Sequence, residues 1–379
     1  MQGSTAPAEV AARIVADRVA PNAAAGWAAR RPDGEWELSA GGQTDAFFDL
    51  ASLTKPMTAM AVARATGLRR RTIGSILPVA RGTPSEEVTV ELLLAHRSGL
   101  EANLPLFRPL LEGRRAELQE ALIEMARARR ADAHGPIPEE GFAPLYSDLG
   151  YLLVGEALAA REGARAGSRE LDMGDVIDRA VVAPLGLEGS LGCARSLEGM
   201  GERVRFAERV VPTEVVPWRG GEVRGRVHDE NAFALRGAGA CGHAGMFGTA
   251  SAVLRFGTAV LDAIARGEGP LATGDDLGWL VRPRQGGTLR AGFDGKSVAS
   301  AAPGEPPSPP SMAGERAGPR TFGHLGFTGT SLWIDPDADA VVVLLTNRVH
   351  PTRENTAIRA ARPRAHDALF GMAAAAVRR

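Results

Sequence analysis

The stretch Ser52-Leu53-Thr54-Lys55 opens an apolar segment, residues 53–65, whose hydrophobic residues recur at helical spacing. Residues three apart lie on one face of a helix, so the Ser52 hydroxyl and the Lys55 amine can meet. The positive potential at a helix N-terminus favours an alkoxide and a neutral amine. The spacing therefore predicts a nucleophilic serine whose proton passes to Lys55.

Lysine is rare in this chain, which makes its position informative. Of 44 basic residues among 379, only Lys55 and Lys296 are lysine, and the other 42 are arginine. A desolvated lysine can lose its proton, whereas arginine effectively cannot. A chain that uses arginine almost everywhere keeps lysine where arginine cannot serve, and this favours a chemical role for Lys55.

A second motif, Tyr146-Ser147-Asp148, precedes an apolar segment at residues 148–161 that we predict to be a helix. A tyrosine in a loop before a helix can point into a cleft. Its ordinary pKa of about 10 is too high for a base at neutral pH, but a nearby ammonium group favours phenolate. We expect Tyr146 and Lys55 to share the removal of the Ser52 proton. Tyr151, inside the apolar segment, is expected in the core.

A third motif, His324-Leu325-Gly326, falls in an extended run at residues 320–328. Gly326 would let a substrate backbone approach the strand edge closely. The backbone N–H of Phe327 would join that of Ser52 in an oxyanion hole. His324 is expected to face a leaving group or a substrate carboxylate.

Strand patterns lie at both ends of the chain and helical patterns lie between them. This order predicts an α+β fold: a central antiparallel sheet built from both termini and flanked by helices, with an inserted helical subdomain. Residues 1–67 and 245–379 would form the α/β subdomain with the serine helix, and 68–244 the helical subdomain with the tyrosine motif. Residues 301–318 are expected to be an irregular surface loop. The expected strands are 24–29, 35–40, 320–328, 331–335 and 340–347; the expected helices are 8–19, 53–65, 89–96, 115–129, 148–161, 175–182, 251–266 and 359–377.

Composition excludes several classes of protein. With 44 basic and 45 acidic residues the net charge is -1, which argues against a general nucleic-acid binder. Two cysteines, Cys193 and Cys241, are too few for a disulfide scaffold or an all-cysteine zinc site. No serine lies in a Gly-x-Ser-x-Gly elbow, which counts against an α/β-hydrolase. We predict a small ester, amide or peptide as the substrate; the oligomeric state stays open.

The sequence has no clear pattern of a metal site or of a membrane-spanning helix. Histidines and acids at residues 228–231 and at His243 could ligate a metal, but no two histidines have helical i, i+4 spacing and no His-Glu-x-x-His occurs. We expect them to brace loops near the cleft, with no metal or cofactor. The apolar run at 340–345 is far shorter than a membrane helix. The first residues show no secretory signal, so a cytoplasmic location is expected.

The three motifs occur in the order and rough spacing of the serine β-lactamase and penicillin-binding protein superfamily, and the chain resembles it over residues 47–347. It looks most similar to the class C β-lactamase-related hydrolases, which include carboxylesterases and D-alanyl-D-alanine carboxypeptidases. The resemblance implies an acyl-enzyme route: Ser52 attacks a carbonyl, Lys55 and Tyr146 move the proton, and water releases the acyl group. Further similar stretches are 92–100, with His96 expected to be structural, 184–187 and 242–247.

Two residues depart from the family's usual motifs. Asp148 stands where the family usually has asparagine, and its carboxylate is expected to pair with Lys55, shift the base role toward Tyr146 and repel anions. His324 stands where β-lactamases usually have lysine, and a mostly neutral histidine offers no fixed cation at pH 7. Both departures favour neutral ester or amide substrates over strong β-lactamase activity. The alternative is a penicillin-binding sensor or assembly protein that is acylated without turnover.

Overall fold

The computed structural model describes residues 6–167, 171–297 and 311–378. Its centre is a six-stranded antiparallel sheet with the order β2-β1-β11-β10-β9-β8. The N-terminal strand β1 pairs with the C-terminal strand β11 along its length, from Ala23 opposite Thr346 to Ala29 opposite Ala340. This confirms a sheet built from both termini. The strands are β1 (Ala23–Arg30), β2 (Trp36–Gly42), β8 (Asp294–Gly295), β9 (Phe322–Leu325), β10 (Ser331–Asp335) and β11 (Ala340–Thr346).

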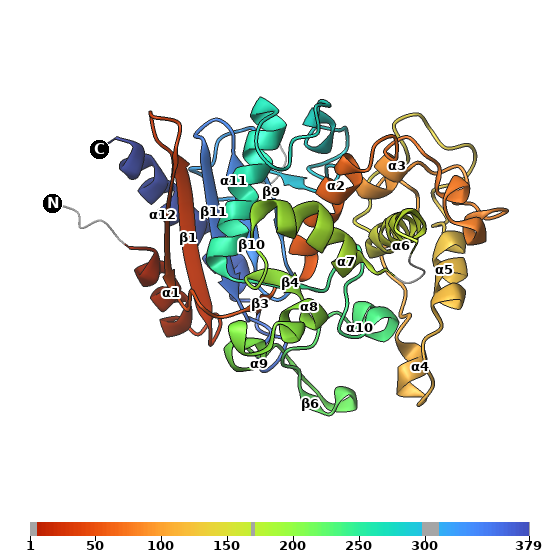
Figure 1. The fold of residues 1–379 in the computed structure, drawn as a ribbon, viewed down its shortest axis with the longest axis horizontal. Helices are drawn as coiled ribbons and strands as arrows, with labels where there is room; N and C mark the ends of the chain where they lie inside the picture. Colours follow the sequence, from red (N-terminus) through yellow and green to blue (C-terminus); the bar gives the residue numbers. More distant parts are fainter. Residues whose placement is uncertain (1–5, 168–170, 298–310, 379) are drawn as a thin grey trace, which may run out of the picture.

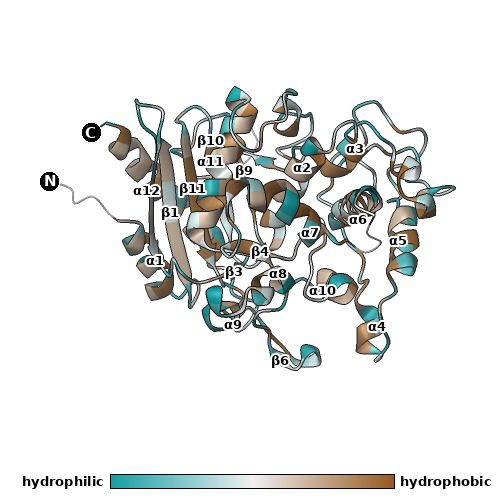
Figure 2. Ribbon diagram, viewed as in Figure 1, coloured by the Kyte–Doolittle hydropathy of each residue, from teal (hydrophilic) through white to brown (hydrophobic). Residues whose placement is uncertain are grey.

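Helices cover both faces of this sheet. The sequence of β11, Ala-Val-Val-Val-Leu-Leu-Thr, is apolar on both faces, and all seven residues are buried. Figure 2 shows the hydropathy of the elements around it. Val341 and Val343 contribute to the core under α11 (Ala250–Arg266), while Val342 and Leu344 contribute to the core under α1 (Pro7–Ala16) and α12 (Ile358–Val377). In Figure 1 α1 and α12 flank the sheet on its left and α11 on its right.

The mainly helical part of the chain lies beyond α11 in Figure 1 and joins the same core. The described residues also form two small sheets, one of β3, β7 and β4 and one of β5 and β6. The division at residues 67/68 and 244/245 stays a prediction. The remaining elements are β3 (Phe48–Asp49), α2 (Thr54–Arg64), α3 (Val90–Leu94), α4 (Arg108–Leu111), α5 (Leu118–Arg127), α6 (Asp148–Arg165), α7 (Met173–Ile177), β4 (Leu191–Cys193), α8 (Ala194–Gly199), α9 (Phe206–Arg209), β5 (Val215–Val216), β6 (Gly221–Glu222), α10 (Glu230–Arg236) and β7 (Met246–Gly248).

Most predicted elements differ from the structure by a few residues at one end or both, and two of these differences have a clear physical reason. The helix expected at 175–182 begins at Met173, where the Asp172 capping box satisfies free N–H groups, and it continues as a π-helix over Asp178–Val182. The strand expected at 320–328 ends at Leu325, because the chain then turns back into β10. In the loop expected at 301–318, residues 311–318 form no helix or strand, and 301–310 lie outside the described residues.

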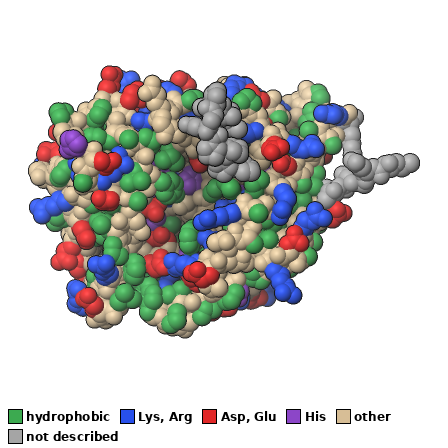
Figure 3. Space-filling model, turned by 180° about the vertical axis from the view of Figure 1, so that it is seen from behind, with side chains coloured by type: hydrophobic (Ala, Val, Ile, Leu, Met, Phe, Trp, Pro, Cys, Tyr) green, Lys and Arg blue, Asp and Glu red, His purple; other side chains and the backbone are tan. Residues whose placement is uncertain are grey.

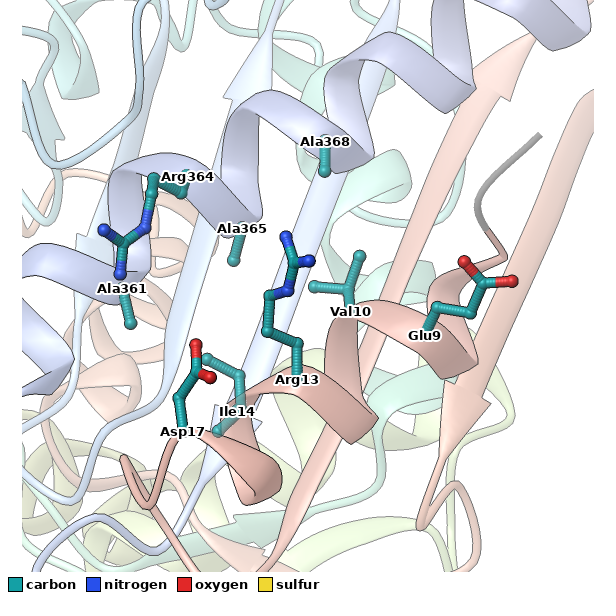
Figure 4. A pocket seen from close by; sticks show the side chains of 9 residues that line it. All are labelled: Glu9, Val10, Arg13, Ile14, Asp17, Ala361, Arg364, Ala365 and Ala368. Atoms are coloured by element: carbon teal, nitrogen blue, oxygen red, sulfur yellow. The ribbon is translucent and has the colours of Figure 1, made fainter. Parts of the chain in front are cut away.

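The outer face of the sheet holds a cavity of about 280 Å³ between α1 and α12 (Figure 4). Its lining is partly apolar, with charged side chains from both helices around it, and it contains none of the predicted site residues. Acidic and basic side chains are interspersed over the face of the molecule in Figure 3. Among the described residues, no helix combines the length and apolar character needed to cross a membrane.

Candidate active site

Ser52 lies in a 3₁₀ turn, Ala51–Leu53, that leads directly into α2 at Thr54, so it precedes the α-helix by two residues. Ala51 has a φ of +49°, a left-handed conformation that costs a non-glycine residue about 1–2 kcal/mol. The Ala51 N–H donates to Asp49 Oδ1 at 2.8 Å. The strained turn therefore depends on neighbouring contacts to hold Ser52 in place.

The turn between β9 and β10 supplies those contacts. The hydroxyl of Thr328 donates to the Asp49 carbonyl at 2.7 Å, and that of Thr330 donates to the Leu50 carbonyl at 3.0 Å. Both threonines are buried. They tie the segment after the predicted histidine motif to the segment before Ser52, so the two motifs share one wall of the site.

Lys55 connects Ser52 to Asp148. Its ammonium Nζ donates to Ser52 Oγ at 2.9 Å and to Asp148 Oδ1 at 2.6 Å, and its side chain is fully buried. Burial alone would lower the pKa of Lys55, but the charge of Asp148 and the Tyr146 phenol together outweigh it, so the pKa is raised. The predicted Ser52–Lys55 contact and the predicted ion pair are both present, and Lys55 is an ammonium group at neutral pH.

Tyr146 lies in the loop before α6 and also reaches this cluster. Lys55 Nζ lies 4.7 Å from the centroid of its ring. Crowding of the phenol by packed atoms raises the pKa of Tyr146, Lys55 lowers it, and the charge of Asp148 raises it again. The net shift of the Tyr146 pKa is upward, so the prediction that this pKa is lowered is wrong. The Lys55 ammonium does favour phenolate, but burial and the charge of Asp148 together have the larger, opposite effect. Tyr146 is a protonated phenol at neutral pH.

His96 positions the tyrosine loop in a way that the sequence did not reveal. Its Nδ1 accepts a hydrogen bond from the backbone N–H of Ser147 at 2.9 Å. Burial and the nearby Lys55 charge hold the pKa of His96 well below its ordinary value, so the ring stays neutral and keeps its acceptor. Tyr151 is in the core as predicted, and its hydroxyl donates to the Leu94 carbonyl at 2.7 Å.

His324 is buried on β9, and its Nδ1 lies 2.8 Å from the Leu325 carbonyl, which fixes the proton on that nitrogen. Burial, followed by the Lys55 charge, lowers the pKa of His324 to about 3, so the imidazole is neutral, as expected from sequence. The ring centroid lies 6.0 Å from that of Tyr146. Because His324 does not line the cavity beside Ser52, its contact with substrate stays a prediction.

Gly326 and Phe327 follow His324 at the cavity. A Cβ on Gly326 would collide with the Thr330 hydroxyl and lie 2.6 Å from the Leu50 carbonyl oxygen. Glycine is therefore required by packing against the serine turn, a reason that differs from the predicted approach of substrate. Phe327 is 47% exposed, and its backbone N–H has no acceptor within the described part of the chain. That leaves this N–H available for a substrate oxygen.

Five of the predicted residues line one cavity of about 490 Å³. Ser52, Tyr146 and Asp148 line one part of it and Gly326 and Phe327 another, while Lys55 lies buried behind them. The remaining lining includes residues that the sequence did not single out as ligand contacts. They are Ala51, Asn103, His228, Asp229, Glu230, Ala244, Leu325, Arg348, Arg353, Arg359 and Arg362.

Arg362 is a buried cation of this cavity that the sequence gave no reason to select. Its guanidinium donates to the carbonyls of Gly326 at 2.7 Å and Thr330 at 2.9 Å, and its Nε has no partner in the described ranges. Burial and the charge of Arg348 lower its pKa to about 9. The sequence analysis predicted that the site has no fixed cation beside the serine. In the structure, Arg362 of α12 and the arginines of the segment before α12 place positive charge at this cavity.

The residues that could have ligated a metal instead contact other protein groups. His228 Nε2 lies 2.9 Å from Glu214, and His243 Nε2 lies 2.9 Å from Asp229. Asn231 donates to the Leu104 carbonyl at 2.8 Å. These contacts connect the segment around α10 to neighbouring loops at the cavity. Within the described ranges, no group of three or more histidines, cysteines or acids is placed to hold a metal ion.

A six-stranded antiparallel sheet between helices, with a serine, a buried lysine and a tyrosine around one cavity, defines a β-lactamase/transpeptidase-like fold. The chain belongs to the β-lactamase family, because the family model described as Beta-lactamase matches residues 10–366. The family indicates a hydrolase.

Known proteins of several activities resemble this chain. A putative D-alanyl-D-alanine carboxypeptidase of Escherichia coli K12 is 26% identical over 218 residues, covering 56% of this chain and 46% of its own length. The match thus spans about half of that relative. A class C β-lactamase from Rhodobacter sphaeroides superimposes with a TM-score of 0.61 at 18% identity, covering 96% of this chain and 98% of its own. A family VIII carboxylesterase gives a TM-score of 0.59 at 18% identity, covering 96% and 99%.

Proposed function

We propose that the protein is a serine acyl hydrolase that forms an acyl-enzyme with a small ester or amide substrate, of the esterase or D-amino-acid peptidase type, with weak β-lactamase activity. The observation that carries this proposal is the 2.9 Å hydrogen bond between Ser52 Oγ and the buried Lys55 ammonium at the edge of a 490 Å³ cavity. The carboxypeptidase and carboxylesterase named among its relatives support the two substrate types.

In the proposed reaction Ser52 Oγ forms a bond to the substrate carbonyl carbon, and its proton passes to the cluster formed by Lys55, Tyr146 and Asp148. The backbone N–H groups of Ser52 and Phe327 hold the resulting oxyanion; one such donor is typically worth about 3–4 kcal/mol. Collapse breaks the bond to the leaving group, which takes up the proton. Water then attacks the acyl-enzyme, and the proton that it loses returns to Ser52.

The cavity's charges refine the substrate class. Three acids line the cavity, and each has a partner: Asp148 is paired with Lys55, Glu230 is paired with Arg353, and Asp229 lies 2.9 Å from His243 Nε2. Arg362 lines the same cavity and makes no ion pair with the described acids. We therefore favour an ester or amide that carries a carboxylate over the neutral substrate predicted from sequence.

The second candidate is a sensor or assembly protein that is acylated and not released. The observation that favours it is Asp148, because its charge keeps Lys55 protonated and so weakens Lys55 as a base for the water that must attack the acyl-enzyme. Burst kinetics separate the two candidates. One equivalent of product followed by no further release supports the sensor, and continued release supports the hydrolase.

Intact-protein mass spectrometry tests the proposal directly. Wild type and Ser52→Ala are each exposed to a fluorophosphonate, short p-nitrophenyl esters and a panel of β-lactams. We expect wild type to gain the mass of an acyl or phosphonyl group and Ser52→Ala to gain none, while circular dichroism shows both folded. A folded Ser52→Ala protein with full turnover would exclude the assignment.

A further inference from the structure

Lys55 is placed between two oxygen atoms that it serves as a donor. The distances from its Nζ are 2.9 Å to Ser52 Oγ and 2.6 Å to Asp148 Oδ1. An ammonium group has three donors and no acceptor. In this arrangement Lys55 cannot take the Ser52 proton until it has given up one of its own, and the carboxylate is the nearest acceptor that the geometry offers.

We propose that Asp148 is the terminal acceptor of the Ser52 proton, which reaches it through Lys55. This inference rests on the proposed acyl hydrolase function. As Ser52 Oγ bonds to the carbonyl carbon, Lys55 passes a proton to Asp148 and receives the Ser52 proton after its amine rotates. The cluster then holds the Lys55 ammonium and a neutral Asp148 carboxyl group. On collapse the leaving group takes a proton from Lys55, and Asp148 returns its proton to Lys55.

The other titratable groups around Lys55 are poorly suited to this role. The Tyr146 phenol is already protonated at neutral pH, since burial and Asp148 raise its pKa. Tyr151 donates its hydroxyl proton to the Leu94 carbonyl. The acceptor nitrogen of His96 is occupied by the Ser147 N–H. His324 makes no hydrogen bond to Lys55 or Ser52 within the described ranges, and its pKa, lowered to about 3 by burial, makes it a weak base. Asp148, by contrast, is a carboxyl group in direct contact with Lys55.

Exposure supports the direction of the transfer. The Lys55 side chain is 0% exposed, whereas that of Asp148 is 23% exposed and lines the cavity. A proton that reaches Asp148 is therefore beside bound substrate and close to solvent. A protonated carboxyl group beside the cavity also removes the negative charge during the step in which an oxyanion forms.

The pH dependence of acylation distinguishes the relay from a tyrosine base. The pre-steady-state acylation rate with a p-nitrophenyl ester is measured from pH 3 to 10 for wild type, Asp148→Asn and Asp148→Glu. A carboxylate takes up a proton at lower pH than an amine does. If the relay operates, the acylation rate of wild type therefore rises with pH in the acidic range, and this rise is the acidic limb of the pH–rate profile. In Asp148→Asn the base becomes Lys55 itself, and the limb moves to higher pH, with acylation about 10²-fold slower at pH 6 and recovering at alkaline pH.

A tyrosine base gives the opposite result. Acylation by wild type would then rise only at alkaline pH, and removal of the Asp148 charge would move the limb to lower pH, because that charge raises the pKa of Tyr146. Either that shift or an unchanged limb in Asp148→Asn overturns the relay. Asp148→Glu keeps a carboxylate and is expected to keep the acidic limb. Glu230→Gln, which removes another cavity carboxylate, is expected to leave the limb where it is.

Failure of the relay and failure of the proposed function are distinguishable in the same experiment. If wild type is acylated on Ser52 but the acidic limb of Asp148→Asn moves to lower pH or does not move, the hydrolase assignment stands and the proposed role of Asp148 is wrong. If wild type is not acylated at any pH by esters, β-lactams or the fluorophosphonate, the hydrolase assignment fails and the relay fails with it.

Discussion

The imidazole of His96 stacks on the ring of Tyr146, with the ring centroids 4.6 Å apart and the planes inclined by 25°. The same imidazole accepts the backbone N–H of Ser147, the next residue of the motif. One buried side chain therefore fixes both the ring and the backbone of the tyrosine loop, from a stretch of sequence fifty residues away.

Replacement of His96 by leucine should displace that loop. The Ser147 N–H loses its acceptor inside the protein, which costs about 1–3 kcal/mol of unfolding free energy. We expect kcat to fall more than KM rises, because Tyr146 and Asp148 both depend on the loop. Ester hydrolysis and urea unfolding measure the two effects. His134→Leu, at an exposed position, is the control; equal behaviour of the two variants would contradict this role for His96.

Replacement of Lys55 by arginine should nearly abolish acylation. Arginine keeps the positive charge, but its proton is not released at any working pH, so it cannot pass a proton between Ser52 and another group. A loss of at least about 10²-fold is expected in the burst rate with p-nitrophenyl esters. The other lysine provides a matched control, since Lys296 donates to the Glu315 carbonyl and does not line the cavity. Activity close to wild type in a folded Lys55→Arg protein would exclude proton transfer by Lys55.

Replacement of Gly326 by alanine should lower both stability and activity. The added methyl group would meet the Thr330 hydroxyl and the Leu50 carbonyl, and overpacking of this kind typically costs about 1–3 kcal/mol. Because Leu50 precedes the serine turn, relief of the clash moves Ser52. Thermal unfolding and ester hydrolysis report the two losses. Gly199→Ala, where no heavy atom lies within 4 Å of the added Cβ, should leave both close to wild type.

Stability should fall as the pH drops below about 6.5. Burial lowers the pKa of His324 and of His366 to about 3, so both are neutral in the folded chain while the unfolded chain takes up their protons from about pH 6.5 downward. Their contribution is fully present above pH 6.5 and is lost toward pH 3, at about 1.4 kcal/mol per pH unit for each histidine. Urea unfolding between pH 7 and 5 measures the slope. A His366→Gln variant with an unchanged slope would contradict the assignment to His366.

The central chemistry could be predicted from sequence because it depends on short-range spacing. Ser52 and Lys55 are three residues apart, so one turn of chain is enough to bring them together, and the apolar run of β11 is sufficient to indicate a buried strand. The charge state of Tyr146 could not be predicted, because it depends on how many atoms pack around the phenol. That number is a property of the tertiary structure.

The arginines of the cavity illustrate the same limit. Arg362 comes from α12, far along the chain from Ser52, and reaches the site through the carbonyls of the turn after β9. With 42 arginines in the sequence, nothing in its local surroundings marks this one. His96 had only a weak signal, its place in a stretch similar to the family, and that signal gave no indication of contact with Tyr146.

The pairing of β1 with β11 sets the order in which the molecule can form during synthesis. Ala23 and Thr346 are opposite one another in the sheet. Strand β1 therefore cannot pair with β11 until the ribosome has synthesised residues 340–346. Until then β1 exposes an edge, and the helices that later cover it have no surface to pack on. Contacts between such distant residues also make folding slow. The serine turn, which depends on the β9–β10 turn, therefore reaches its final structure only after the residues of β9, β10 and β11 have been synthesised.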